Sequence, residues 1–193
     1  MSNLLSFSAI IPAAGNSGRM GSDKALLRLA NGKSFAENLL INYAELGADP
    51  VVIIVNNSFD LTRINLGSSV CIINDHVEYG RSYSIKLGIQ HIPAGHSCFI
   101  QNIDNPFVDQ NLLCALLYAV KDDSYVIPVY NEKGGHPVLL GKNIISVMNE
   151  NDSFLDFREV LKKFSRIEIP WENPRIRLNI NTPGDYQKFL ERI

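Results

Sequence analysis

The sequence predicts a single α/β domain over residues 1–193, in which helices cover both faces of a mostly parallel sheet to give three αβα layers. Short apolar runs rich in β-branched residues alternate with helical patterns along nearly the whole chain, as expected for strands joined by right-handed helical crossovers. The length of 193 residues suits one domain, and no repeat or low-complexity linker divides it. Sheets of this class bind their ligands at the carboxyl ends of the strands.

The first strand is expected at Phe7–Pro12, followed by a glycine-rich loop over residues 13–23. Ser34 and Glu37 then have the spacing of a capping box, in which each side chain bonds the other residue's backbone N–H. Apolar residues follow at helical spacing until Gly47. This pattern predicts a helix between Ser34 and Gly47.

Three continuous apolar runs predict strands buried on both faces, as in parallel sheets. They are Val51–Val55, Val70–Asn74 and Ser97–Gln101. Between and after them, helices are expected over Arg81–His91 and from an Asp109 N-cap to Val120.

The final third of the chain mixes short strands with amphipathic helices. Strands are expected at Tyr125–Tyr130, Pro137–Leu140, Arg166–Ile169 and Ile176–Ile180. Helices are expected at Asn143–Glu150, at Phe154–Phe164 and after Pro183.

The composition excludes several classes of protein. Eighteen Lys and Arg residues against twenty Asp and Glu residues give a net charge of −2, without the basic excess of an electrostatic nucleic-acid binder. The first residues lack the basic and apolar regions of a signal peptide, and no apolar stretch approaches the roughly 20 residues that span a bilayer. Cys71, Cys98 and Cys114 lie in apolar runs without zinc-ligand spacing. We therefore expect a cytoplasmic protein with reduced core cysteines and neither nucleic-acid nor membrane partners.

The loop after the first predicted strand carries the strongest signal for an anion site. It turns through Gly15, Gly18 and Gly21, and it contains Arg19 and Lys24. Glycines let backbone N–H groups converge on an anion, and the two cations add charge. The loop fits neither common phosphate-loop pattern and is not a nucleophile elbow. The alternative is a polar, flexible connection between a strand and a helix.

Asp104 follows the predicted buried strand 97–101, where α/β sheets place their ligands. A carboxylate there, followed by the rigid Pro106, suits a Mg²⁺ ion that bridges substrate phosphates. Alternatively, Asp104 only opens a turn before the proline.

Near the C-terminus, Asn179 and Asn181 fall on one face of the predicted strand 176–180 and its end. The amide oxygen of Asn181 is a second possible ligand for a hard metal. The alternative is a helix start, with Thr182 as N-cap and Pro183 at the first helical position. Both interpretations are compatible, because the cap leaves Asn181 available.

Two weaker signals complete the set. Gly80, Ser84 and the basic residues between Gly80 and Lys86 open a predicted helix, which is favourable for an anion or base contact. Alternatively, a serine simply caps that helix. Gly135 and His136 lie in a turn between strands, where His136 can contact a second substrate or serve a purely structural role.

Together these segments resemble the nucleotidyltransferases with a Rossmann-like, glycosyltransferase-A-type fold, and most of all the molybdopterin cytidylyltransferase and guanylyltransferase branch. The resemblance covers nearly the whole chain, in order. The matching segments are Pro12–Leu27, Gly80…Ser84…Gly88, Asp104–Pro106, Gly135–Leu139 and Asn179–Tyr186.

The resemblance implies transfer of a nucleoside monophosphate from a nucleoside triphosphate to a phosphate-bearing acceptor such as molybdopterin, with release of pyrophosphate. In-line attack at the α-phosphorus needs mainly positioning and cations, since the acceptor phosphate is already an anionic nucleophile. By resemblance, Asp104 and Asn181 hold Mg²⁺, and Arg19, Lys24 and Asp104 are catalytic. The implied nucleotide contacts are Ala13, Ala14, Gly15, Ser17, Arg19, Lys24, Gly80 and Ser84. Gly135 and His136 are the implied acceptor contacts.

Two features bear on specificity. The Ala13-Ala14-Gly15 loop resembles the cytidylyl type and favours CTP, whereas the guanylyl type tends to carry glycine at the second position. Asn179 and Asn181 replace the two carboxylates of the family's closing motif, although related uridylyltransferases also use an asparagine there. Two alternatives therefore stay open: a sugar-phosphate or methylerythritol-phosphate nucleotidyltransferase, and a non-catalytic nucleotide-binding partner of a molybdoenzyme. The acceptor and the oligomeric state are not determined by the sequence.

Overall fold

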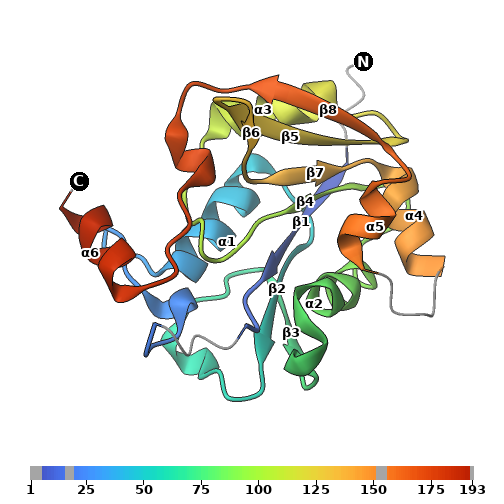
Figure 1. Cartoon of the computed structure of the whole chain (residues 1–193). Coiled ribbons are helices and arrows are strands. Elements are labelled where there is room, and N and C mark those ends of the chain that lie inside the picture. Colours follow the sequence, from blue (N-terminus) through green and yellow to red (C-terminus); the bar gives the residue numbers. More distant parts are fainter. Residues whose placement is uncertain (1–5, 16–19, 151–155, 192–193) are drawn as a thin grey trace.

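The computed structural model describes residues 6–15, 20–150 and 156–191. Within these ranges, eight strands form one mixed sheet with helices on both faces (Figure 1), which confirms the predicted α/β class. The strands are β1 Phe7–Pro12, β2 Val51–Asn56, β3 Val70–Asn74, β4 Ser97–Ile100, β5 Ser124–Tyr130, β6 Lys133–Gly134, β7 Val138–Leu140 and β8 Ser165–Pro170. The α-helices are α1 Phe35–Leu46, α2 Gly80–Ile89, α3 Gln110–Ala119, α4 Lys142–Glu150, α5 Phe157–Leu161 and α6 Pro183–Leu190. Short 3₁₀ helices are η1 Lys24–Leu26, η2 Leu61–Arg63, η3 Val77–Tyr79 and η4 Pro174–Arg177.

The sheet has the strand order β3-β2-β1-β4-β7-β5-β6, and β8 pairs with β5. Strands β3, β2, β1 and β4 run parallel, whereas β7 runs antiparallel to both β4 and β5. The chain moves outward from β1 to β2 and β3, and then crosses to β4 on the other side of β1. A crevice at the carboxyl ends of β1 and β4 follows from this change of direction, as expected at a topological switch point.

The core lies in two layers because successive strand residues point to opposite faces. Ala9 and Ile11 of β1 face α1 and α3, whereas Ile10 faces α2, α4 and α5. A smaller cluster of Met20, Phe35, Ile180 and Phe189 joins α6 to the start of α1. This third cluster fixes the C-terminal segment against the N-terminal loop region.

The N-caps Ser34, Asp109 and Thr182 were predicted correctly, whereas the capping box at Thr182 was not predicted. Ser34 Oγ accepts from the Glu37 N–H, and Glu37 Oε2 accepts from the Ser34 N–H, while Gly47 ends α1 with φ +98°. Thr182 and Asp185 form a second capping box at α6. Such contacts need only neighbouring residues, so the pattern of letters is sufficient to find them.

The segment 176–180 is not a strand, contrary to the prediction. Asn173 Oδ1 accepts from the Arg175 N–H and starts η4, with Pro174 at its first position. Beyond η4, the Ile180 N–H bonds the carbonyl oxygen of Asp104 at 2.7 Å. Local capping therefore overrides the alternating pattern, and Asn179 and Asn181 do not share a strand face.

Three further expectations need correction. β3 is an edge strand, not a strand buried on both faces, and Ile73 is 49% exposed. All three cysteines are free, but only Cys98 belongs to the core, since Cys71 is half-buried and Cys114 exposed. Helix α5 covers Phe157–Leu161 because Asp156 caps it, and the expected start at residue 154 lies outside the described residues. Among those residues, no helix has both the length and the apolar character to cross a membrane.

Candidate active site

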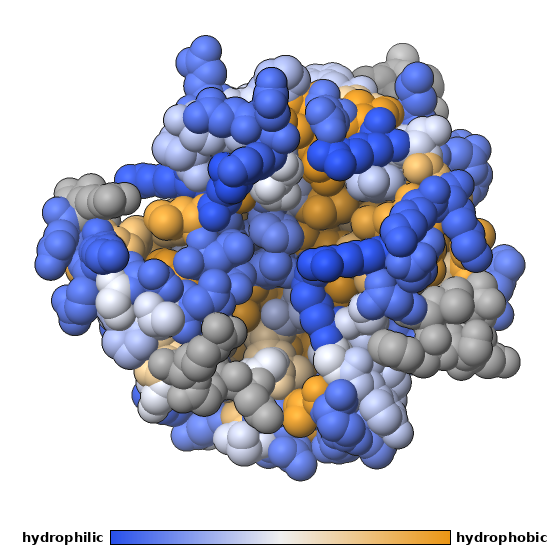
Figure 2. Space-filling view, in the orientation of Figure 1, coloured by the Kyte–Doolittle hydropathy of each residue, from blue (hydrophilic) through white to orange (hydrophobic). Residues whose placement is uncertain are grey.

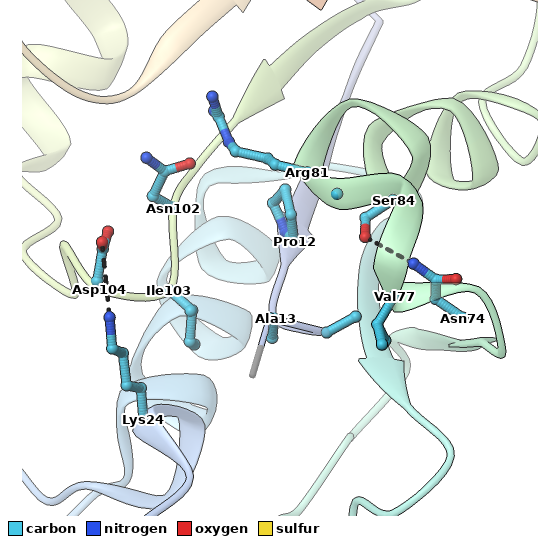
Figure 3. Close-up of a pocket in the computed structure, with 13 residues that line it drawn as sticks. Pro12, Ala13, Lys24, Asn74, Val77, Arg81, Ser84, Asn102, Ile103 and Asp104 are labelled. Carbon is cyan, nitrogen blue, oxygen red and sulfur yellow. Dashed lines mark hydrogen bonds and ion pairs between the residues drawn. The ribbon is translucent and has the colours of Figure 1, made fainter. Parts of the chain in front are cut away.

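A pocket of about 200 Å³ opens at the carboxyl ends of β1 and β4, beside the first turn of α2 (Figure 3). The face drawn in Figure 2 is hollowed near its centre, where apolar surface shows between hydrophilic side chains. The lining residues are Pro12, Ala13, Ala14, Gly15, Lys24, Asn74, Val77, Gly80, Arg81, Ser84, Asn102, Ile103 and Asp104. Most of the residues singled out from the sequence therefore meet in one cavity. Ser17 and Arg19 lie outside the described residues.

The loop after β1 forms one wall of the pocket. The Ala13 N–H donates to the Ile54 carbonyl at 2.7 Å, which holds the loop against the end of β2. Ala13 and Ala14 are buried, whereas Gly15 is exposed. Apart from Gly15 and its two chain neighbours, no atom of the described residues lies within 4 Å of the place where a Cβ of Gly15 would be. The described residues thus leave the space in front of Gly15 open to a ligand.

Lys24 joins two predicted metal ligands that are far from it in the chain. Its Nζ donates to Asn181 Oδ1 at 2.6 Å and lies 4.0 Å from Asp104 Oδ2. The Ile180–Asp104 backbone bond and the packing of α6 on α1 bring Asn181 to this place. The ammonium of Lys24 accordingly lies between the two residues that the sequence analysis assigned to a metal.

Asp104 is held by a buried polar network in the loop 101–106. The Gln101 side chain accepts from the Tyr43 hydroxyl at 3.0 Å and donates to the Asn105 carbonyl at 2.6 Å. The Asn105 amide in turn donates to the carbonyl oxygens of Arg175 and Ile176. Sequence reasoning missed both supporting side chains. Their only signal was a polar run directly after a buried strand.

The electrostatics of Asp104 suit a cation. Burial raises the pKa of the Asp104 carboxyl, while the charges of Lys24 and Arg81 act in the opposite direction. Asp104 Oδ1 is buried and has no hydrogen-bond partner among the described residues. A desolvated acceptor of this kind normally has a partner, so it fits a metal ion or a ligand group.

The described residues contain no cluster of three or more His, Cys, Asp or Glu side chains that could enclose a metal. One carboxylate and one amide instead fit an ion such as Mg²⁺, which keeps several waters and is completed by substrate phosphates.

Gly80 and Ser84 line the pocket from α2. Asn74 is buried at the end of β3 and donates to Ser84 Oγ at 3.0 Å. Gly80 has φ +76°, a conformation that glycine adopts readily. The alternative of a serine-capped helix is wrong, because the N-cap position is Tyr79 and no side chain caps it. Asn74 is a pocket residue that the sequence analysis did not single out.

Gly135 and His136 lie behind the pocket and not in its lining. A Cβ on Gly135 would be 2.6 Å from the Ile176 carbonyl oxygen, and the His136 N–H donates to that same oxygen. The His136 ring contacts the Asn102 amide, with 2.9 Å between Nε2 and Nδ2. Burial, aided by the charge of Arg81, lowers the pKa of His136 to about 4. His136 is therefore neutral at pH 7 and reaches the pocket through Asn102.

Two further pocket residues, Arg81 and Asn102, were not individually predicted from the sequence as site residues. Arg81 was visible only as one of the basic residues near Gly80, and Asn102 as a polar neighbour of Asp104. The fold brings their side chains to the same wall as Asp104 (Figure 3).

The strand order and the pocket at the switch point define an α/β protein that binds ligands at the carboxyl edge of its parallel strands. Residues 9–167 match the family model of the MobA-like NTP transferase domain. The chain belongs to this family and is a nucleotidyltransferase, which confirms the resemblance found in its motifs.

Curated relatives agree with this assignment, and solved structures share the fold. The molybdenum cofactor cytidylyltransferase of Escherichia coli (strain K12) is 25% identical over 185 residues, covering 95% of each chain. A probable molybdenum cofactor guanylyltransferase of Natranaerobius thermophilus is 27% identical and covers 94% of this chain and 93% of its own. The structure of Rv0371c from Mycobacterium tuberculosis H37Rv covers 97% of this chain and all of its own, with a TM-score of 0.83 and 17% identity. That protein has also been solved in complex with manganese, with a TM-score of 0.77, 16% identity, and coverage of 97% and 98%.

Proposed function

We propose that this protein transfers a nucleoside monophosphate, preferentially CMP, from a nucleoside triphosphate to a phosphate-bearing acceptor such as molybdopterin, with release of pyrophosphate. The observation that carries the proposal is the meeting of Lys24, Asp104 and Asn181 beside the Ala13–Gly15 loop. In this proposal the whole chain works as one cytoplasmic domain.

The nucleotide would lie along the loop after β1. Its base and ribose would contact Ala13, Ala14, Gly15, Ser17, Gly80 and Ser84. Arg19 and Lys24 would hold the triphosphate, where their charge stabilises the pyrophosphate that develops as leaving group. The open space in front of Gly15 supports this placement, because a backbone without Cβ lets phosphate or sugar approach closely.

Asp104 and Asn181 would hold Mg²⁺. When bound, the ion polarises the α-phosphate and neutralises charge on the triphosphate. Lys24 now lies between these two residues, so its ammonium would turn from Asn181 toward the phosphates as metal and nucleotide enter.

The preference for CTP rests on the second loop alanine. Ala14 is 1% exposed and packs in the core layer under α2, so the loop has little freedom to move aside for a larger base. The cytidylyl and guanylyl relatives have similar identities to this chain. Direct comparison of nucleotides is therefore the decisive measurement.

The test is a thermal-shift series with CTP, GTP, UTP and ATP, each with and without Mg²⁺, followed by pyrophosphate release with molybdopterin. A shift with CTP and Mg²⁺ that exceeds the others, together with release, supports the proposal. No shift with any nucleotide overturns it. Pyrophosphate release only with a sugar phosphate or methylerythritol phosphate would assign the protein to the transferases of those acceptors. Nucleotide binding without pyrophosphate release on any acceptor would favour the non-catalytic nucleotide-binding protein.

A further inference from the structure

Arg81 places a second cation at the pocket, on the other side of Asp104 from Lys24. It is the second residue of α2, and its side chain extends over Asn102, whereas Lys24 approaches Asp104 from η1 (Figure 3). The guanidinium lies 5.7 Å from the ring centre of Phe157. It makes no hydrogen bond or ion pair with any residue in the described ranges. An exposed arginine at a pocket rim with its donors unused is available to an anion.

Two buried polar atoms beside Arg81 also lack partners. Asn102 Oδ1 and His136 Nδ1 have none among the described residues, although the two side chains contact each other through their other polar atoms. A buried polar group without a partner is unfavourable, so an incomplete pair of this kind points to a missing ligand.

The hydrogen-bond direction between these two residues leaves Asn102 Oδ1 available to Arg81. As the amide is placed, the Asn102 NH₂ donates to His136 Nε2, which puts the proton of the neutral ring on Nδ1. Nδ1 is then a donor. Asn102 Oδ1 is an acceptor and therefore cannot bind the anion itself. It can instead accept from an N–H of Arg81 when the guanidinium binds a ligand.

We propose that Arg81, supported by Asn102 and His136, binds the phosphate group of the acceptor; this rests on the proposed function. In the transfer step, an oxygen of the acceptor phosphate forms a bond to the α-phosphorus. The bond from that phosphorus to the bridging oxygen of the β-phosphate breaks, and pyrophosphate leaves with the electron pair. The two oxygens must lie on opposite sides of the phosphorus. Lys24 would bind the leaving pyrophosphate, and Arg81 lies where the phosphate of the acceptor would enter.

The chemistry of the guanidinium suits this role. Its planar fork can bond two oxygens of one phosphate, which orients the nucleophile as well as attracting it. Phe157 lies under the guanidinium and limits its movement. A role in packing α2 against α5 alone would explain the Phe157 contact but not the unpartnered atoms of Asn102 and His136.

The test compares Arg81→Gln and Arg81→Lys with the matched control Arg158→Gln, which removes an exposed arginine of α5 that does not line the pocket. Calorimetry first measures CTP binding with Mg²⁺, which Arg81→Gln should leave within about threefold of wild type. With CTP saturating, inorganic phosphate is then titrated as a probe of the acceptor phosphate. Arg81→Gln should weaken phosphate binding at least about tenfold and Arg81→Lys less, while Arg158→Gln retains it. In turnover, the KM for the acceptor should rise and that for CTP should not.

Several outcomes would overturn this role. If Arg81→Gln weakens CTP and phosphate equally, Arg81 holds the triphosphate. If phosphate binding is unchanged, or if wild type binds no phosphate with CTP present, the subsite is not there. If the variant only lowers the melting temperature, Arg81 is a packing residue. Failure of the proposed function looks different, because wild type would then bind no nucleoside triphosphate at all.

Discussion

Lys24 Nζ donates a 2.6 Å hydrogen bond to Asn181 Oδ1, although 157 residues separate the two in the chain. The bond fastens the C-terminal segment to the start of η1, directly beside Asp104. The ammonium of Lys24 thus lies beside Asn181 Oδ1 and Asp104 Oδ2, the two oxygens that would bind the proposed metal. This arrangement leads to the first prediction.

Lys24→Met should increase the affinity of the nucleotide-free protein for Mn²⁺ by at least about tenfold. Two charges 4 Å apart near a protein surface interact by roughly 4 kcal/mol, so removing the ammonium removes a large repulsion from a second cation. Titration of Mn²⁺ followed by electron paramagnetic resonance measures this. Lys33→Met, at an exposed lysine, is the control. Equal Mn²⁺ affinity in Lys24→Met and wild type would show that Lys24 and the metal do not compete.

Asp104→Asn should reduce turnover at least about a hundredfold without destabilising the fold at pH 7. Because burial raises the pKa of Asp104 in the folded state, ionising this group costs stability at neutral pH, and a neutral amide of the same shape avoids that cost. Pyrophosphate release and thermal unfolding measure the two effects. The control is Asp60→Asn, which keeps a capping side chain at η2. A parallel loss of activity and melting temperature would mean that Asp104 is structural.

His136 should make the protein less stable as the pH falls from 6.5 to 4. The pKa of His136 is about 4 in the folded state and near 6.5 in the unfolded chain, so the unfolded state binds more protons across this window. The difference corresponds to roughly 3 kcal/mol lost by pH 4. Urea unfolding at pH 7, 5 and 4 should show a steeper fall for wild type than for His136→Gln, with the exposed His91→Gln as control. Parallel curves for wild type and His136→Gln would contradict this expectation.

Gly135→Ala should destabilise the protein by about 1–3 kcal/mol, the usual cost of overpacking. The new Cβ would lie 2.6 Å from the Ile176 carbonyl oxygen, and a backbone atom cannot move aside as a side chain can. In contrast, the new Cβ of Gly184→Ala in α6 would meet, among the described residues, Thr182 Oγ1 alone, at 3.8 Å. This change should be neutral or stabilising by up to about 1 kcal/mol because alanine favours helix. Denaturant unfolding compares the two. Equal stabilities would show that η4 shifts freely away from Gly135.

Features that depend on near neighbours in the chain were predictable. The capping box at Ser34, the N-cap at Thr182 and the buried strand 51–55 follow from local patterns, and the structure contains them. The expected strand 176–180 failed because Asn173 and Pro174 start a 3₁₀ helix there. The prediction that Val70–Asn74 is buried on both faces was wrong. Burial depends on where a strand lies in the sheet, and β3 lies at the edge.

The sequence by itself determined the α/β class, the family and the chemical types in the site: a glycine-rich loop, a lysine, a carboxylate after a strand, and a terminal asparagine. Those properties depend on which residues are present and on how far apart they lie along the chain. Only the tertiary structure decided that Lys24 would lie between Asp104 and Asn181. It also decided that Gln101 and Asn105 would hold the loop that carries Asp104, and that Arg81 would lie on the other side of Asp104 from Lys24. Such contacts join residues far apart in the chain, because sheet order and helix packing set their distances.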